Sequence, residues 1–265
     1  MQTENTNLPI TKELIGLNLL ERYTGSKVDA FQKYIILTNF SAYVELFAEF
    51  TNTRVHHGSA MNVCHDDRNN ISIINYGVGS PVAALVIDLI SLIHPIATIN
   101  LGLCGGLRDE FHVGEYFNPV AAIREEGTSM AYIPARCPAL SSFVIQRFIC
   151  DELEQSKLIY HNGVIHTTNV RFWEFNEDFK KNLIEEKAQA IDMECATLFS
   201  VGYARRIPVG ALMLITDLPF KLSGIKTKAS SEMVFKDYAE NHVKIAITVL
   251  KNMQKKESEG FNYEF

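Results

Sequence analysis

Short apolar runs alternate with longer helical patterns along this chain. The runs are rich in Val, Ile and Leu without strict alternation, which is typical of strands that are covered on both faces. They predict strands over 34–37, 71–75, 96–101, 116–123, 188–191 and 209–215. The patterns between them predict helices over 42–50, 82–93, 139–154, 177–186, 195–206 and 232–253. This alternation favours an α/β fold in which a mostly parallel or mixed sheet carries helices on both faces.

No repeat, low-complexity tract or Pro/Gly-rich linker divides the 265 residues. We therefore expect a single domain over 1–265, with a charged, frayed tail over 255–265. Residues 1–9 are polar and form no apolar signal core, and the longest apolar stretch, 81–103, is interrupted by Asp88, His94 and Pro95. These features predict a soluble, cytoplasmic protein without membrane contact.

Charge and cysteine content narrow the possible functions. The net charge of −6 argues against a general nucleic-acid or membrane binder, because such proteins need a dense basic face. The five cysteines are widely spaced and form no CxxC pair, which argues against a zinc site or a disulfide framework. The histidines and cysteine within 56–66 lack helical ligand spacing. We expect neither a metal nor a cofactor.

Glycines and acids follow the predicted strands. Gly77 and Gly79 follow the strand 71–75, and a glycine-rich run that includes Gly105 follows the strand 96–101. Glu194 and Asp217 follow the last two predicted strands. In open α/β sheets, ligands bind beyond the carboxyl ends of the strands, so these groups are expected to meet on one rim. The glycine runs taken alone are more typical of tight strand–helix turns than of a ligand site.

Each acid allows two interpretations. Glu194 either stabilises the start of the following helix or accepts hydrogen bonds from the vicinal hydroxyls of a ribose, with Met193 packed in the core or on the sugar. Asp217 is either a turn residue or a general acid whose pKa is raised at a partly dry rim. Arg171, Phe172 and Trp173 form either a pinned surface loop or a lid that offers an aromatic plane to a base and a guanidinium to a phosphate.

The combination of motifs resembles the purine nucleoside phosphorylase and nucleosidase superfamily. The run 190–197, which contains Asp192-Met193-Glu194, resembles its ribose-binding motif, although Cys195 replaces a Ser or Ala. Thr216-Asp217 resembles its catalytic [ST]-D pair, and the two glycine runs occur in the expected order. The resemblance implies a three-layer α/β/α fold with a central mixed, partly closed sheet, and a homohexamer.

Within this superfamily, the runs 22–25, 31–34, 37–40 and 104–108 are similar to the catalytic domain of AMP nucleosidases, and 167–174 resembles their Arg-x-Trp-Glu loop. This likeness implies hydrolysis of AMP to adenine and ribose 5-phosphate, with Asp217 as general acid at the purine and Glu194 on the ribose hydroxyls. It implies further substrate contacts from the residues Met193, Arg171, Phe172, Trp173, Gly77, Gly79, Gly105, Asn39 and Arg108. The cations expected for the 5′-phosphate are Arg171, then Arg108, Lys33, Arg22 and Lys221.

Departures from the phosphorylase pattern favour water as the nucleophile. Where phosphorylases carry an Arg and a Ser around the second glycine run, this chain has Asn100 and Leu103, and 38–40 lacks the glycine and Arg that follow their first strand. The 265 residues also leave no room for the N-terminal regulatory domain of long AMP nucleosidases. Three alternatives stay open: a purine nucleoside phosphorylase, a methylthioadenosine-type nucleosidase, and a non-catalytic nucleotide sensor.

Overall fold

The computed structural model describes residues 11–221, 224 and 228–260. The strands are β1 (Tyr34–Thr38), β2 (Val55–His57), β3 (Asn62–Asp66), β4 (Ile71–Asn75), β5 (Ala97–Gly106), β6 (Tyr116–Glu125), β7 (Ala139–Leu140), β8 (Tyr160–Thr168), β9 (Ala190–Asp192) and β10 (Val209–Asp217). The α-helices are α1 (Lys12–Thr24), α2 (Ser41–Thr51), α3 (Ser80–Ile90), α4 (Phe143–Gln155), α5 (Glu177–Glu185), α6 (Cys195–Arg205) and α7 (Lys228–Ser258). A 3-10 turn, η4 (Trp173–Phe175), precedes α5.

The strands form one mixed sheet that closes on itself at one end. Their order is β10-β6-β8-β9-β5-β1-β4-β3-β2, and β10 also pairs with β5. The strands β5, β10, β6, β8 and β9 therefore form a closed ring, from which β1, β4, β3 and β2 extend. Pairing is parallel between β1 and β5 and antiparallel between β10 and β6. The mixed, partly closed sheet that the resemblance implied is confirmed.

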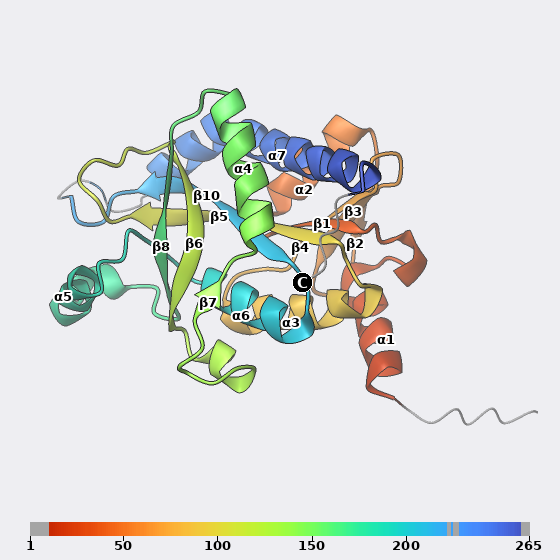
Figure 1. Cartoon of the computed structure of the whole chain (residues 1–265), viewed down its shortest axis with the longest axis horizontal. Coiled ribbons are helices and arrows are strands. Elements are labelled where there is room, and N and C mark those ends of the chain that lie inside the picture. The colour runs from red at the N-terminus through yellow and green to blue at the C-terminus, as the bar shows by residue number, and fades with distance from the viewer. Residues whose placement is uncertain (1–10, 222–223, 225–227, 261–265) are drawn as a thin grey trace, which may run out of the picture.

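Helices cover both faces of the sheet, as Figure 1 shows, with α2, α4 and α7 on one side and α3 and α6 on the other. Alternate residues of β1 enter different apolar clusters. Ile36 packs in the cluster that contains residues of α2, α4 and α7, whereas Ile35 and Leu37 pack with α3 and α6. A strand buried on both faces needs apolar side chains at successive positions, which explains the uninterrupted apolar runs of the sequence. The three-layer α/β/α fold is thereby confirmed.

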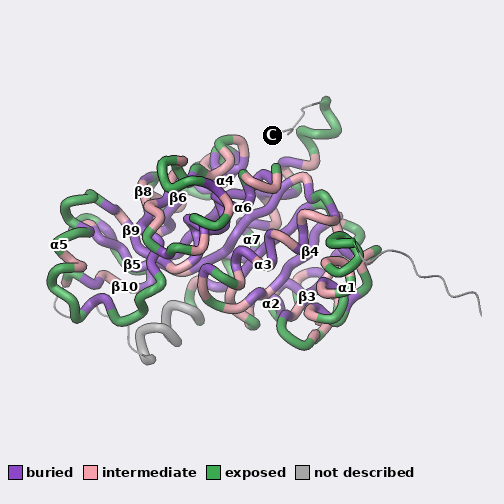
Figure 2. The backbone as a smooth tube through the Cα atoms, turned by 90° about the horizontal axis from the view of Figure 1, so that it is seen from below, coloured by how far each residue is buried: buried purple, intermediate pink, exposed green. Residues whose placement is uncertain are grey.

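Burial follows this layering. In Figure 2 the strands of the sheet are mostly buried, whereas α5 and the turns around it at one end of the molecule are largely exposed. The cysteines are all free thiols, and Cys64, Cys104 and Cys195 are buried. Among the described helices, none combines the length and the apolar character needed to cross a membrane.

Several predicted boundaries change because strands pair with partners that are distant in the sequence. The predicted helix over 139–154 begins at Phe143, because Ala139 and Leu140 pair with β6 as β7. The strand β8 was not predicted at all, since polar residues and Gly163 break its pattern. The predicted turn after residue 101 is in fact the second half of β5. The predicted frayed tail is helical to Ser258, and 261–265 lie outside the described residues.

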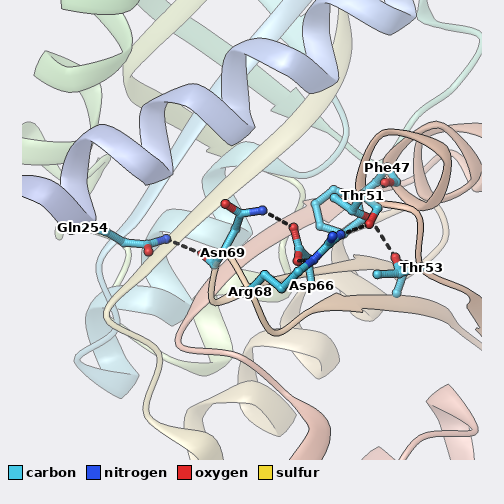
Figure 3. A network of polar contacts seen from close by, with 8 residues as sticks. Phe47, Thr51, Thr53, Asp66, Arg68, Asn69 and Gln254 are labelled. Atoms are coloured by element: carbon cyan, nitrogen blue, oxygen red, sulfur yellow. Dashed lines mark hydrogen bonds and ion pairs between the residues drawn. The ribbon is translucent and has the colours of Figure 1, made fainter.

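A network of polar contacts joins the turn between β3 and β4 to the helices α2 and α7, as Figure 3 shows. The fully buried Asp66 at the end of β3 accepts a hydrogen bond from Asn69 and forms an ion pair with Arg68, N to O 3.5 Å. Arg68 also donates to the carbonyl of Thr51 at the end of α2. Gln254 of α7 donates to the carbonyl of Asn69 at 2.7 Å. The β3–β4 turn is therefore joined to helices from both halves of the chain.

A neutral histidine lies between α7 and the sheet. The Nε2 of His242 lies 2.9 Å from the carbonyl oxygen of Leu212, and its Nδ1 lies 2.9 Å from the Tyr43 hydroxyl. A carbonyl can only accept, so Nε2 carries the proton and Nδ1 accepts from Tyr43. Burial lowers the pKa of His242 to about 4. The ring is therefore neutral in the folded protein near pH 7.

Candidate active site

A cavity of about 200 Å³ lies where the carboxyl ends of β1, β8, β9 and β10 meet. Its lining residues come from six separate stretches of the chain: Asn39, Phe40, Val78, Leu103, Cys104, Gly105, Thr168, Val170, Arg171, Trp173, Glu174, Ile191, Asp192, Met193, Glu194, Thr216 and Asp217. The structure thus brings Glu194 and Asp217 to one cavity, together with Met193, Gly105 and Asn39 from the predicted set.

Glu194 enters the cavity from the turn between β9 and α6. It is 4% exposed, and its Oε1 accepts a hydrogen bond from the backbone N–H of Gly79 at 2.7 Å. The side chain of Asn39 donates a further hydrogen bond to the carboxylate. Burial, and then the charge of Asp192, raise the pKa of Glu194 to about 8. The group therefore ionises just above neutral pH, or when a cation or a hydrogen-bond donor arrives.

Asp192 performs the helix-stabilising role that the sequence left open for Glu194. Its Oδ2 accepts from the backbone N–H groups of Glu194, at 3.1 Å, and Cys195, at 2.7 Å, at the start of α6. Its Oδ1 accepts from Thr167 Oγ1 at 2.6 Å. Burial raises the pKa of Asp192, and these hydrogen bonds act in the opposite direction. Because donors and a helix N-terminus surround Asp192, it holds the negative charge of the pair, and Glu194 takes the proton.

Asp217 is the last residue of β10 and pairs with Gly105 of β5. Its Oδ1 accepts a hydrogen bond from Thr216 Oγ1 at 2.8 Å. A Cβ atom on Gly105 would lie 3.3 Å from Asp217 Oδ2 and 3.0 Å from the ring of Pro219. The glycine therefore leaves room for the carboxyl group, although it does so from within a strand and not from the turn that the sequence predicted.

The first glycine run is a turn, as predicted, and it contacts the site through a hydrogen bond from Gly79 to Glu194. Gly77 and Gly79 have φ angles of 90° and 103°, which side chains strongly disfavour. Neither residue lines the cavity, whereas Val78 between them does. The conformation of Gly79 directs its N–H toward Glu194, so the turn acts through hydrogen bonding to this carboxyl group.

The loop after β8 forms another wall. Trp173 is 5% exposed, lines the cavity and packs against the ring of Phe179. Phe172 is 74% exposed and does not line the cavity, so of the two predicted aromatics the structure brings only Trp173 to the site. Arg171 lines the cavity, and its Nη1 donates to Glu174 Oε1 at 2.8 Å.

The remaining predicted cations lie elsewhere. Arg108 donates to the carbonyl of Lys187 at 2.6 Å, and Lys221 donates to that of Asp109 at 3.0 Å. Lys33 donates to the carbonyl of Ile93 at 2.6 Å, and Arg22 lies over the Tyr23 ring. Of the described residues that line the cavity, Arg171 is the only basic one.

Sequence reasoning missed several lining residues. Glu174, Asp192, Thr168 and Leu103 line the cavity but were not among the predicted contact residues. Asp192 and Glu174 lie inside the predicted motifs, but only the tertiary structure shows that they are buried in the cavity lining. Thr168 was missed because β8 was not predicted. Polar residues of β8 are buried against partners that are far away in the sequence, as Thr167 is against Asp192.

Comparison with known proteins identifies the family. A family profile described as Phosphorylase superfamily matches residues 33–251. The chain belongs to the phosphorylase superfamily. Its structure superposes on that of the AMP nucleosidase from Bacteroides thetaiotaomicron with a TM-score of 0.83 and 38% identity, covering 94% of this chain and 100% of the other. This identity also groups the chain with that protein inside the superfamily, as its motifs indicated.

Three further relatives have lower identity to this chain. The AMP nucleosidase of Escherichia coli K12 is 26% identical over 89% of this chain, which spans 58% of that protein. The guanosine phosphorylase of Halorubrum lacusprofundi is 24% identical over 70% of this chain and 76% of its own length. A uridine phosphorylase structure from Vibrio fischeri, 22% identical with a TM-score of 0.75 over 86% of this chain and 93% of the other, shares the fold.

Proposed function

We propose that this protein hydrolyses the N-glycosidic bond of AMP to adenine and ribose 5-phosphate. The observation that carries the proposal is the convergence of Glu194 and Asp217 on one cavity, which Trp173 and Arg171 also line. The likeness to proteins named AMP nucleosidase supports the choice of substrate.

The chemistry divides between the two acids. Cleavage of the bond between C1′ and N9 passes through a transition state in which the sugar gains positive charge and the purine gains electron density. Asp217 donates a proton at N7, so adenine leaves as a neutral base. Glu194, once ionised, accepts hydrogen bonds from the ribose hydroxyls and stabilises the cationic sugar. Water attacks C1′ from the opposite face and releases a proton to the solvent, which completes ribose 5-phosphate. Asp217 takes up a proton in turn, so the cycle balances.

The composition of the cavity favours water over orthophosphate as the nucleophile. Leu103 lines the cavity at a position where phosphorylases carry Ser. Asn100, at the position of their Arg, is buried and accepts a hydrogen bond from the Tyr76 hydroxyl at 3.1 Å. Arg171 is the one cation among the described lining residues, and we assign it to the 5′-phosphate.

Product analysis tests the proposal. Purified protein is incubated with AMP, adenosine or methylthioadenosine, each with and without orthophosphate. We expect adenine release from AMP in both conditions, with ribose 5-phosphate as the sugar product. A strict requirement for orthophosphate and a ribose 1-phosphate derivative would establish a phosphorylase. A preference for methylthioadenosine would establish the other nucleosidase class, and AMP binding without adenine release would establish a sensor. The homohexamer and the cytoplasmic location stay predictions, and light scattering in solution tests the former.

A further inference from the structure

The chain leaves Asp217 through a turn, residues 218–221, that packs closely against the strand β5. A Cβ atom on Gly106 would lie 3.0 Å from the side chain of Leu218, so the glycine leaves room for the turn beside the strand. The backbone N–H of Lys221 donates to the carbonyl of Leu218 at 2.9 Å, which closes the turn. The position of this turn therefore bears directly on the acid that precedes it.

The side chain of Lys221 joins this turn to the loop between β5 and β6. Its Nζ donates to the carbonyl oxygen of Asp109 at 3.0 Å and to that of Phe111 at 3.4 Å. Hydrogen bonds from a charged donor are stronger than those between neutral groups. Phe111 is 2% exposed, so the loop that receives the ammonium is itself held in the core. Lys221 does not line the cavity, and its donors are directed to backbone carbonyls of the protein.

Phe220 joins the same turn to the aromatic side chain that lines the cavity. The ring centroids of Phe220 and Trp173 lie 6.4 Å apart, and the ring planes meet at 88°. This edge-to-face arrangement is a favourable one for aromatic pairs. Trp173 is 5% exposed and lines the cavity. A displacement of the turn would therefore remove an aromatic contact from Trp173 at the same time as it moved Asp217.

We propose that Lys221 is a positioning residue, which holds the turn 218–221 in place and thereby fixes Asp217 and Trp173 relative to each other. The assignment rests on the proposed function only in treating Asp217 as the acid and Trp173 as a contact of the base. Proton transfer to a bound purine needs the donor and the acceptor at hydrogen-bond distance. A small displacement of either partner lowers the rate strongly, so an acid and a base contact that share one support keep their geometry.

The test compares Lys221→Met with the wild type and with Lys181→Met, a matched change at a 74% exposed lysine of α5. Met keeps an unbranched apolar stem but has no ammonium, whereas Lys221→Arg keeps a cationic donor and is the rescue variant. Trp173 is the single tryptophan of the chain, so quenching of its fluorescence by acrylamide reports on this side chain without any turnover. Steady-state kcat and KM are then measured for AMP, and thermal melting verifies that each variant is folded.

We expect Lys221→Met to lower kcat for AMP by about 10-fold with a smaller change in KM, because the acid is misplaced. The same variant should raise the Stern–Volmer constant of Trp173 at least about twofold, because a loosened contact exposes a buried ring. Lys181→Met should leave both quantities at their wild-type values, and Lys221→Arg should recover most of both. Phe220→Leu, which removes only the aromatic contact, is the second variant and should change both quantities in the same direction as Lys221→Met.

A rise in KM for AMP at unchanged kcat would show that Lys221 binds the 5′-phosphate and would overturn the assignment. In an active enzyme, unchanged kcat and quenching, or a change in only one of the two, would overturn it as well. If quenching changes as expected but the wild type does not hydrolyse AMP, the proposed function alone is refuted.

Discussion

The coupling between Asp192 and Glu194 makes a quantitative prediction about the pH dependence of catalysis. The pKa of Glu194 is raised from 4.5 to about 8, first by burial and then by the charge of Asp192. That difference corresponds to about 5 kcal/mol in favour of the protonated form. At pH 7 only about one tenth of the free enzyme then carries a Glu194 carboxylate. The ionised fraction of Glu194 therefore rises roughly tenfold between pH 7 and pH 9. Because the ionised form stabilises the cationic sugar, this ionisation should form the ascending limb of the kcat/KM profile, while loss of the Asp217 proton should form the descending limb.

The perturbation is Asp192→Asn, which removes the charge and leaves an amide oxygen to accept from the start of α6. Since the charge of Asp192 raises the pKa of Glu194, the rising limb of the profile should move to lower pH. The assay is adenine release from AMP under kcat/KM conditions from pH 6.5 to 9.5. The second ionisation of a phosphate monoester lies near about pH 6, so the substrate does not titrate in most of this range.

Asp178→Asn is the matched control, because Asp178 lies exposed in the first turn of α5. Asp178→Asn should leave the pH of the ascending limb unchanged from that of the wild type. A wild-type profile with no ascending limb would refute the ionisation of Glu194 as the controlling event. If the ascending limb of Asp192→Asn lies at the same pH as that of the wild type, the electrostatic coupling is refuted. A melting temperature close to that of the wild type would show that the fold of the variant is intact.

Two further predictions concern other residues. Asp217→Asn should lower kcat for AMP at least about 100-fold, because the amide cannot protonate adenine, with little change in thermal melting; near-wild-type turnover would remove Asp217 from the acid role. His242 has a folded pKa of about 4 against an ordinary value of 6.5, so its contribution to stability is complete above pH 6.5 and is lost as the pH falls toward 4. The free energy of unfolding in urea should fall between pH 7.5 and pH 5 by about 2 kcal/mol less in His242→Gln than in the wild type. Equal falls in the two proteins would contradict a neutral buried ring.

The sequence alone determined the class of the fold and singled out two acids, Glu194 and Asp217, that both line the cavity. Mostly apolar runs such as 71–75 and 209–215 indicated strands covered on both faces, because side chains on either face of such a strand need burial. Glu194 and Asp217 follow strands directly. Residues that follow neighbouring strands lie at one rim of the sheet, so local pattern placed both acids there. Their selection as the reacting acids came from the resemblance to the superfamily motifs.

Only the tertiary structure decided which neighbouring side chain performs which role. Asp192 and Glu194 lie in the same turn of the sequence, but Thr167 and the start of α6 contact the first, while Gly79 contacts the second. Tertiary packing likewise buries Trp173 and leaves its neighbour Phe172 exposed. Closure of the ring by β8 and β10 brings together residues far apart in the chain, and the resulting burial of polar groups leaves no periodic signal in the sequence.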